Sequence, residues 1–212
     1  MQADFSVECA AGDDCLEFPW ASGELRYFDL KERPELLLEI AETHGNAELG
    51  EFLSAINSPA SMLESVKCDA WATTEIMPEE EIFGATHKFA SYIDLIFCEP
   101  ALRFEFAKHE NFLRRVARLL GKAPDISSSA EFMLRRCVYH ECALAAASES
   151  ALAGKAGGSR DGFGITFYLF GYGDDDDEAR CRWAIGLKLV ENALLQLSAT
   201  HRRGADQTAP LP

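Results

Sequence analysis

The sequence predicts an α+β fold in which an antiparallel sheet is covered by about four helices. Apolar residues recur with a period of two in three segments, which is typical of strands. They recur at the helical period in two longer segments, which is typical of amphipathic helices. The chain has 212 residues, of which 48% are apolar, and this is enough to build a core without a disulfide or metal. We expect one globular domain over residues 1–200 and a C-terminal tail over 201–212.

The first 30 residues contain three short extended segments. These segments, "FSVECA", "CLEFPW" and "ELRYFDL", are separated by the turn-like stretches "AGDD" and "ASG". We interpret them as possible edge strands. A helical region is expected over 34–57, because Pro34 suits a first helical turn, Gly45 suits a C-cap and Pro59 follows the last turn.

Two strands are predicted near 64–76 and 83–98. In the first, Val66, Cys68 and Ala70 alternate with Lys67 and Asp69. In the second, one face carries Phe83, Ala85, His87, Phe89, Ser91, Ile93, Leu95 and Phe97. The acidic link "MPEEE" between them favours an antiparallel hairpin.

Two helices are predicted near 101–120 and 129–153. The first starts at Pro100, and its last turns are basic, which suits the negative end of the helix dipole. The second is assigned because apolar residues at 133, 134, 137, 138, 142 and 145 fit the helical period and alanines follow. Ser128 and Glu131 also form a capping-box pattern. The alternative for 132–142 is a strand.

The last two elements are a strand near 163–172 and a helix near 177–199. The helix carries an apolar stripe of Trp183, Leu187, Val190, Leu194 and Leu197. The preceding run, Asp174 to Glu178, could hold a divalent cation. We interpret it instead as a helix cap, because acidic groups favour the start of a helix and consecutive aspartates do not converge on one centre.

The stretch "CVYHEC" is the strongest candidate for a metal or catalytic site. Neither a helix nor a strand brings Cys137, His140 and Cys142 to one centre, and a zinc site needs about four ligands, with no second pair present. We favour core cysteines beside a half-exposed histidine and expect no metal and no cofactor. A site completed by distant residues, with Cys137 or His140 reactive, is the alternative.

Two further residues are candidate ligand contacts. His87 lies on the apolar face of its predicted strand, either as a pocket base or as a hydrogen-bonded core histidine. Trp71 lies on the more polar face, where it either binds a ligand or meets a helix, and we favour the helix. The chain contains no motif of a phosphate loop, dinucleotide site, zinc protease or serine hydrolase.

Composition argues against several partners and locations. The net charge of −15 disfavours binding to nucleic acid, which needs Lys and Arg to replace counterions, and disfavours anionic membranes. No apolar run reaches 18 residues, and the N-terminus does not resemble a secretory signal. The seven cysteines in a chain without such a signal predict a cytoplasmic location.

We expect self-association as a two-fold dimer. Ala184, Leu189, Ala193 and Leu195 widen the apolar surface of the last helix beyond one stripe. In the strand "ITFYLF", Tyr168 and Phe170 point away from Ile165, Phe167 and Leu169, so both faces need cover. A monomer whose own helices cover these positions is the alternative.

Three function classes follow from these observations. We favour a non-catalytic binding or interaction protein that self-associates. The second class is a small-ligand or enzymatic pocket that uses His87, Cys137 or His140. The third is an acidic, secretion-chaperone-like dimer, an analogy at the level of the fold alone. A strand at 132–142 would favour this third class, because the element order would become α-β-β-α-β-β-α.

Overall fold

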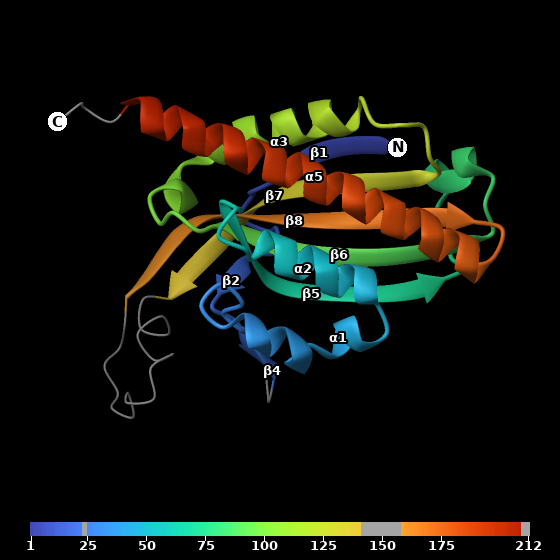
Figure 1. Cartoon of the computed structure of the whole chain (residues 1–212), viewed down its shortest axis with the longest axis horizontal. Coiled ribbons are helices and arrows are strands. Elements are labelled where there is room, and N and C mark those ends of the chain that lie inside the picture. The colour runs from blue at the N-terminus through green and yellow to red at the C-terminus, as the bar shows by residue number, and fades with distance from the viewer. Residues whose placement is uncertain (23–24, 141–157, 209–212) are drawn as a thin grey trace.

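In the computed structural model, residues 1–22, 25–140 and 158–208 are described, and they build a mixed sheet with helices (Figure 1). The sheet has the strand order β1–β7–β8–β6–β5, and β2 pairs with β7 beyond the end of β1. Its strands are β1 (Gln2–Glu8), β2 (Leu16–Phe18), β5 (Leu63–Thr73), β6 (His87–Phe97), β7 (Ser128–His140) and β8 (Ser159–Gly173). A separate two-stranded sheet joins β3 (Ala21–Ser22) and β4 (Leu25–Arg26).

The three strands predicted from a period of two are confirmed as β5, β6 and β8. The antiparallel β5–β6 hairpin is also confirmed, with the 3-10 helix η2 (Pro78–Phe83) in its connection. The prediction of a purely antiparallel sheet is wrong, because β1 and β2 run parallel to β7. A short turn between two strands makes them antiparallel. No such turn joins β1 or β2 to β7, so the sequence does not indicate the direction of this pairing.

The predicted helix over 129–153 is wrong over its first part, which forms β7. This strand pairs with β8 along its whole length and with β1 and β2 on its other side. Its buried residues do alternate, but the buried face changes along the strand: Ala130, Phe132 and Leu134 pack in the main core, whereas Cys137 and Tyr139 are buried on the opposite face. The step of three residues from Leu134 to Cys137 fits a helical spacing, which is why the sequence pattern favours a helix there. The apparent capping box of Ser128 and Glu131 therefore lies in a strand, and residues 141–153 lie outside the described part.

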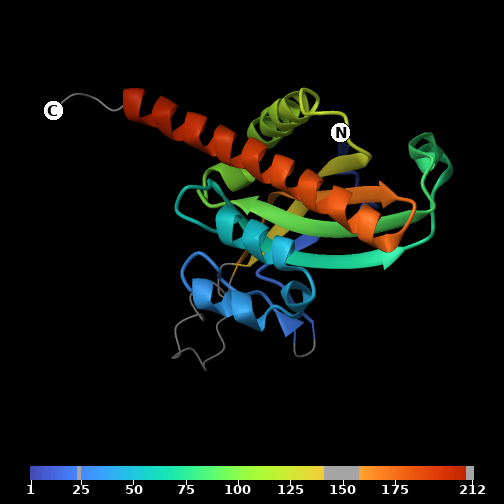
Figure 2. The same ribbon diagram turned by 45° about the vertical axis from the view of Figure 1, so that its right-hand side comes forward.

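A helix layer covers one face of the sheet. It is formed by α2 (Ala47–Ile56), α3 (Phe106–Leu120) and α5 (Asp176–Thr208), which lie on the same side in Figures 1 and 2. The 3-10 helix η3 (Leu102–Phe104) precedes α3. The helix predicted over 177–199 continues to Thr208, so residues 201–208 are helical where we expected a tail. No described helix has an apolar run long enough to cross a membrane.

Residues 20–22 and 25–44 form a small wall beside β5, which we call the N-terminal lobe. It contains the β3–β4 hairpin, the 3-10 helix η1 (Pro34–Glu39) and α1 (Ala41–His44). Figure 2 shows these segments beyond the β5 side of the sheet. The predicted helical region 34–57 is thus divided into η1, α1 and α2, with breaks near Ile40 and Gly45.

The core lies between the sheet and the helix layer. Trp183 is fully buried, packs against Phe89 and donates a hydrogen bond of 2.9 Å from its indole nitrogen to the Ser91 hydroxyl. Gly171 permits this packing, because a Cβ there would lie 2.2 Å from the Trp183 backbone nitrogen. The additional apolar positions of α5 pack against the same core: Ala184, Leu189, Ala193 and Leu195. The chain itself therefore buries these apolar positions of α5, and no partner is needed to cover them.

The acidic run before α5 caps the helix, as its sequence predicts. The Asp175 carboxylate accepts a hydrogen bond of 2.8 Å from the backbone N–H of Glu178, and the Glu178 carboxylate accepts one of 2.7 Å from Asp174. These bonds satisfy backbone donors that a helix start leaves free.

Candidate functional site

The sheet face opposite the helix layer carries a row of aromatic side chains. We call this face the helix-free face, because no α-helix of the described residues lies on it. Along each strand, the residues of this face alternate with the residues that contact the helices. Cross-strand pairing brings the residues at the centre of the face together: Lys67, Asp69, Trp71, Ala90, Tyr92, Asp94, Thr166, Tyr168, Phe170, Glu131 and Met133. Because side chains alternate between faces, each strand contributes every second residue.

The aromatic row crosses three neighbouring strands. The ring centroids of Trp71 and Tyr92 are 6.4 Å apart, those of Tyr92 and Tyr168 are 6.0 Å apart, and Phe170 stacks beside Tyr168 at 6.2 Å. Trp71 is 38% exposed, and the other three rings are half-buried. Aromatic surface of this kind is enriched at the centre of protein interfaces.

One end of the helix-free face is closed by η2. The Lys88 ammonium donates hydrogen bonds to the Glu80 carboxylate, the closer at 2.7 Å, and the Tyr172 hydroxyl donates to the same carboxylate at 2.9 Å. Phe83 stacks on Tyr172 with ring centroids 4.1 Å apart. Although burial opposes ionisation, these hydrogen bonds hold the pKa of Glu80 below its usual value. These contacts fix η2 to the sheet.

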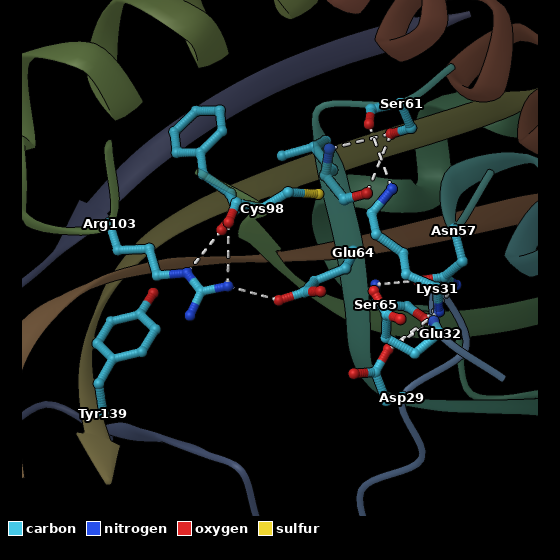
Figure 3. A network of polar contacts seen from close by, with 12 residues as sticks. Asp29, Lys31, Glu32, Asn57, Ser61, Glu64, Ser65, Cys98, Arg103 and Tyr139 are labelled. Atoms are coloured by element: carbon cyan, nitrogen blue, oxygen red, sulfur yellow. Dashed lines mark hydrogen bonds and ion pairs between the residues drawn. The ribbon is translucent and has the colours of Figure 1, made fainter. Parts of the chain in front are cut away.

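A buried ion pair fixes the other end of the sheet (Figure 3). The Arg103 guanidinium lies 2.7 Å from the Glu64 carboxylate, donates a hydrogen bond to the carbonyl of Phe97 and lies over the rings of Phe18 and Tyr139. Burial raises the pKa of Glu64 to about 7, more than the adjacent guanidinium lowers it. Arg103 contacts only backbone and side chains that are themselves packed in the sheet or against it. We therefore interpret this ion pair as one that stabilises the fold.

Beside it, Figure 3 shows a second set of polar contacts around the start of β5. The Asn57 amide joins α2 to this strand, because it donates to the Ser65 hydroxyl at 2.7 Å and accepts from the Ser65 backbone N–H at 3.0 Å. The Lys31 ammonium donates to the carbonyls of Ser58 and Ser61. These contacts hold the N-terminal lobe and α2 in place beside β5.

A cleft of about 420 Å³ lies between the N-terminal lobe and β5. Trp20, Arg26 and Phe28 line it from the lobe, and Lys67 and Tyr92 line it from the sheet. The Lys67 ammonium lies 5.1 Å from the Trp20 ring and 5.8 Å from the Tyr92 ring, a cation–π arrangement. A second cavity of about 200 Å³ shares Trp20 and Lys67 with the cleft. The cleft volume suits a small ligand or a short peptide segment.

The structure does not bring the predicted site residues together. His87 pairs with Gly173 at one end of β8 and Cys137 pairs with Gly162 near the other, which places them roughly 35 Å apart at about 3.3 Å per residue. Since β7 is a strand, Cys137 and His140 lie on opposite faces, and Cys142 lies outside the described residues.

Each of these residues has a local environment of its own. Cys137 is buried in the wall of the smaller cavity, and burial raises the pKa of its thiol to about 12, which disfavours a thiolate. His140 lies 3.9 Å from the Glu17 carboxylate, and His87 contacts the Thr86 hydroxyl at 2.9 Å. In the described part of the chain, no three His, Cys, Asp or Glu side chains are grouped to hold a metal ion.

Trp71 does not meet a helix, because its strand turns it to the helix-free face. The residues that sequence reasoning missed are Trp20, Lys67 and Tyr92, which join this face to the cleft. A signal for Tyr92 was present: it alternates with Phe89, Ser91 and Ile93, so it had to face away from them. Trp20 is brought to β5 by tertiary structure, and no local pattern indicates this.

Comparison of the chain with protein-family models, with curated protein sequences and with solved structures found no match.

Proposed function

We propose that the protein is a non-catalytic interaction protein that forms a two-fold dimer through its helix-free face. The observation that carries the proposal is the aromatic row of Trp71, Tyr92, Tyr168 and Phe170, which stays partly exposed although both ends of the face are closed. A second copy of the same face would bury these rings. This also answers the sequence observation that Tyr168 and Phe170 need cover, which the helix layer does not provide.

The charges across the face suit such a pairing. Lys67 stands on the β5 side, and the exposed carboxylate of Asp4 stands on the β1 side. A two-fold axis parallel to the strands and passing near the central strand β8 would place β5 of one copy over β1 of the other. Lys67 would then approach the acidic edge of the partner copy, which favours this orientation over one that stacks β5 of each copy on β5 of the other.

Light scattering coupled to size exclusion at micromolar concentration tests the dimer. The expected mass is about 47 kDa, twice the 23.4 kDa of one chain. Tyr168→Glu should return the mass to that of one chain, because it places a charge at the centre of the face. Ile185→Glu is the matched control, since Ile185 is 46% exposed on the opposite, helical side. A single-chain mass for the parent across the dilution range would contradict the proposal.

A secretion-chaperone-like dimer is the second candidate, and one observation favours it. With 128–140 as a strand, the elements from α2 to α5 follow the order α-β-β-α-β-β-α that this class predicts. The support is an analogy of architecture, together with the acidic composition. The test is aggregation of reduced insulin in the presence of the protein. Suppression at near-equal molar ratio supports this candidate, and no suppression excludes it while leaving self-association intact.

A further inference from the structure

The outer edge of β5 exposes backbone groups, and the side-chain contacts show which residues carry them. β5 is the last strand of the sheet, so every second residue turns its N–H and C=O away from β6. The carbonyl of Val66 accepts a hydrogen bond of 2.7 Å from the Trp20 indole, and the N–H of Ala70 donates one of 2.7 Å to the Asp69 carboxylate. Both groups therefore point off the sheet.

A β-bulge determines which residues of β5 turn their backbone groups away from β6. The pairing with β6 shifts between Ser65 and Lys67, which makes Val66 the extra residue. Before the bulge, the N–H of Ser65 points outward to Asn57. From the bulge onward, the residues whose backbone groups point away from β6 are Val66, Cys68, Ala70 and Ala72. Among the described residues, no hydrogen bond reaches the backbone N–H or C=O of Cys68 or the C=O of Ala70.

This edge forms one wall of the 420 Å³ cleft, and among the outward groups there the Ser65 N–H and the Val66 carbonyl are already bonded while those of Cys68 are free of any partner in the described part of the chain. Five consecutive residues, Ser65 to Asp69, line the cleft from β5, and the N-terminal lobe faces them. Leu30 and Leu53, which are almost fully buried, supply an apolar floor. A run of strand backbone, an apolar floor and an open side are the features by which a sheet accepts an added strand.

We infer that the cleft binds an extended peptide segment of a partner protein, which adds to the sheet as a strand next to β5. An apolar side chain of the peptide would enter toward Leu30 and Leu53. Its backbone would take the free groups of Cys68 and Ala70, and the Asp69 carboxylate would release the N–H of Ala70. Because strand addition uses backbone groups, the hydrogen bonds themselves need no particular peptide sequence, and the floor of the cleft calls for one apolar side chain.

Charge selects a basic peptide. Carboxylates of Glu39, Glu42 and Asp69 line the cleft, against the two cations Arg26 and Lys67. Both cations already lie over aromatic rings, Arg26 over Phe28 and Lys67 over Trp20 and Tyr92. The whole chain carries a charge of −15, which attracts a basic segment at long range.

A second copy of the chain does not fit this cleft. Its β5 is flanked by its own N-terminal lobe at the same residues, so the two lobes would meet before the two edges could pair along Ser65–Asp69. The peptide site uses the edge of the sheet and the proposed dimer uses its face, and the two meet at Lys67 and Tyr92, which line the cleft and also lie on the face.

The test is fluorescence anisotropy with a labelled, alternating lysine–valine heptapeptide. The control probe has the same sequence with alternate backbone nitrogens methylated, which keeps the charge and removes donors along one edge. A glutamate–valine heptapeptide tests the charge preference. We expect the lysine–valine peptide to bind, and both controls to bind at least about tenfold more weakly.

Two proline variants locate the site. Ala70→Pro removes an outward N–H without breaking a bond to β6, a position where an edge strand tolerates proline. It should weaken binding by about tenfold. Val7→Pro is the matched control on β1, the other edge strand, and should leave binding unchanged.

If Ala70→Pro fails to fold, the comparison of the methylated and unmethylated peptides on the parent protein still decides. Equal binding of the methylated and unmethylated peptides, or no binding at millimolar concentration, would overturn the inference. Peptide binding by the Tyr168→Glu variant would separate this site from the dimer.

Discussion

The indole nitrogen of Trp20 donates a hydrogen bond of 2.7 Å to the carbonyl of Val66, the extra residue of the β5 bulge. Together with the Lys31 and Lys67 contacts, this bond joins the N-terminal lobe to the edge of the sheet. It satisfies a carbonyl that the bulge turns away from β6.

Replacing Trp20 with Phe should lower the free energy of unfolding by about 1 kcal/mol, because the ring is kept and the hydrogen-bond donor is lost. Urea denaturation of the variant and the parent measures the difference. Trp71→Phe is the control, since the Trp71 indole has no hydrogen-bond partner among the described residues and is partly exposed. An equal loss in both variants would mean that ring size, rather than the bond to Val66, matters.

Glu64 should make the protein less stable as the pH rises from about 4.5 to about 7. Its pKa is raised from 4.5 to about 7 in the folded chain, chiefly by burial. Between these values the folded chain keeps a proton that the unfolded chain has released, so raising the pH favours unfolding. The loss attributable to Glu64 is about 2–3 kcal/mol across this range.

Urea midpoints at pH 5 and pH 7.5 measure this effect. The Glu64→Gln variant should lose less stability between the two conditions than the parent. Glu110→Gln is the control, because Glu110 forms an exposed pair with Arg114 on α3. A parent and a Glu64→Gln variant with the same pH dependence would refute the assignment to Glu64.

The helix cap at the start of α5 predicts a localised effect. Asp175→Ala should lower the free energy of unfolding by about 1 kcal/mol, because the N–H of Glu178 loses its acceptor. Asp177→Asn removes a neighbouring charge without removing this hydrogen bond, and its effect should be smaller. Thermal unfolding followed by circular dichroism compares them, and a larger loss for Asp177→Asn would show that charge dominates over capping.

Gly171→Ala should destabilise the fold by about 3 kcal/mol, because its Cβ would lie 2.3 Å from the Ala179 carbonyl oxygen and α5 would have to move off the sheet. Gly12→Ala is the control, as no atom lies within 4 Å of the added Cβ. Chemical denaturation gives both values. An unchanged midpoint for Gly171→Ala would show that α5 is free to shift.

Elements whose apolar residues keep one period throughout could be predicted from the sequence, and β7 could not. β5, β6, α3 and α5 have a periodicity that local pattern shows directly. In β7 the buried face changes between Leu134 and Cys137, so its apolar residues do not keep a period of two along the whole strand. The direction of β1 depends on a partner far along the chain, which local pattern does not contain.

The candidate site was predicted only in part. The outward direction of Tyr168 and Phe170 follows from alternation, so the need for cover on that face could be inferred from the sequence. Trp71 was identified as a candidate contact, yet the sequence did not show that helices leave its face free. The cleft depends on Trp20 and Lys67 meeting across tertiary structure, and neither residue type nor spacing indicates that.

The parallel pairing of β1 has a consequence for the synthesis of the chain. Each residue of this strand pairs with one 127 positions later, as the Glu8–Arg135 ion pair shows. At typical elongation rates of about 5–20 residues per second, β1 waits roughly 6–25 s for β7 to be made. During that interval the hairpin of β5 and β6 is already available, and β1 can join the sheet only after β7 has emerged from the ribosome.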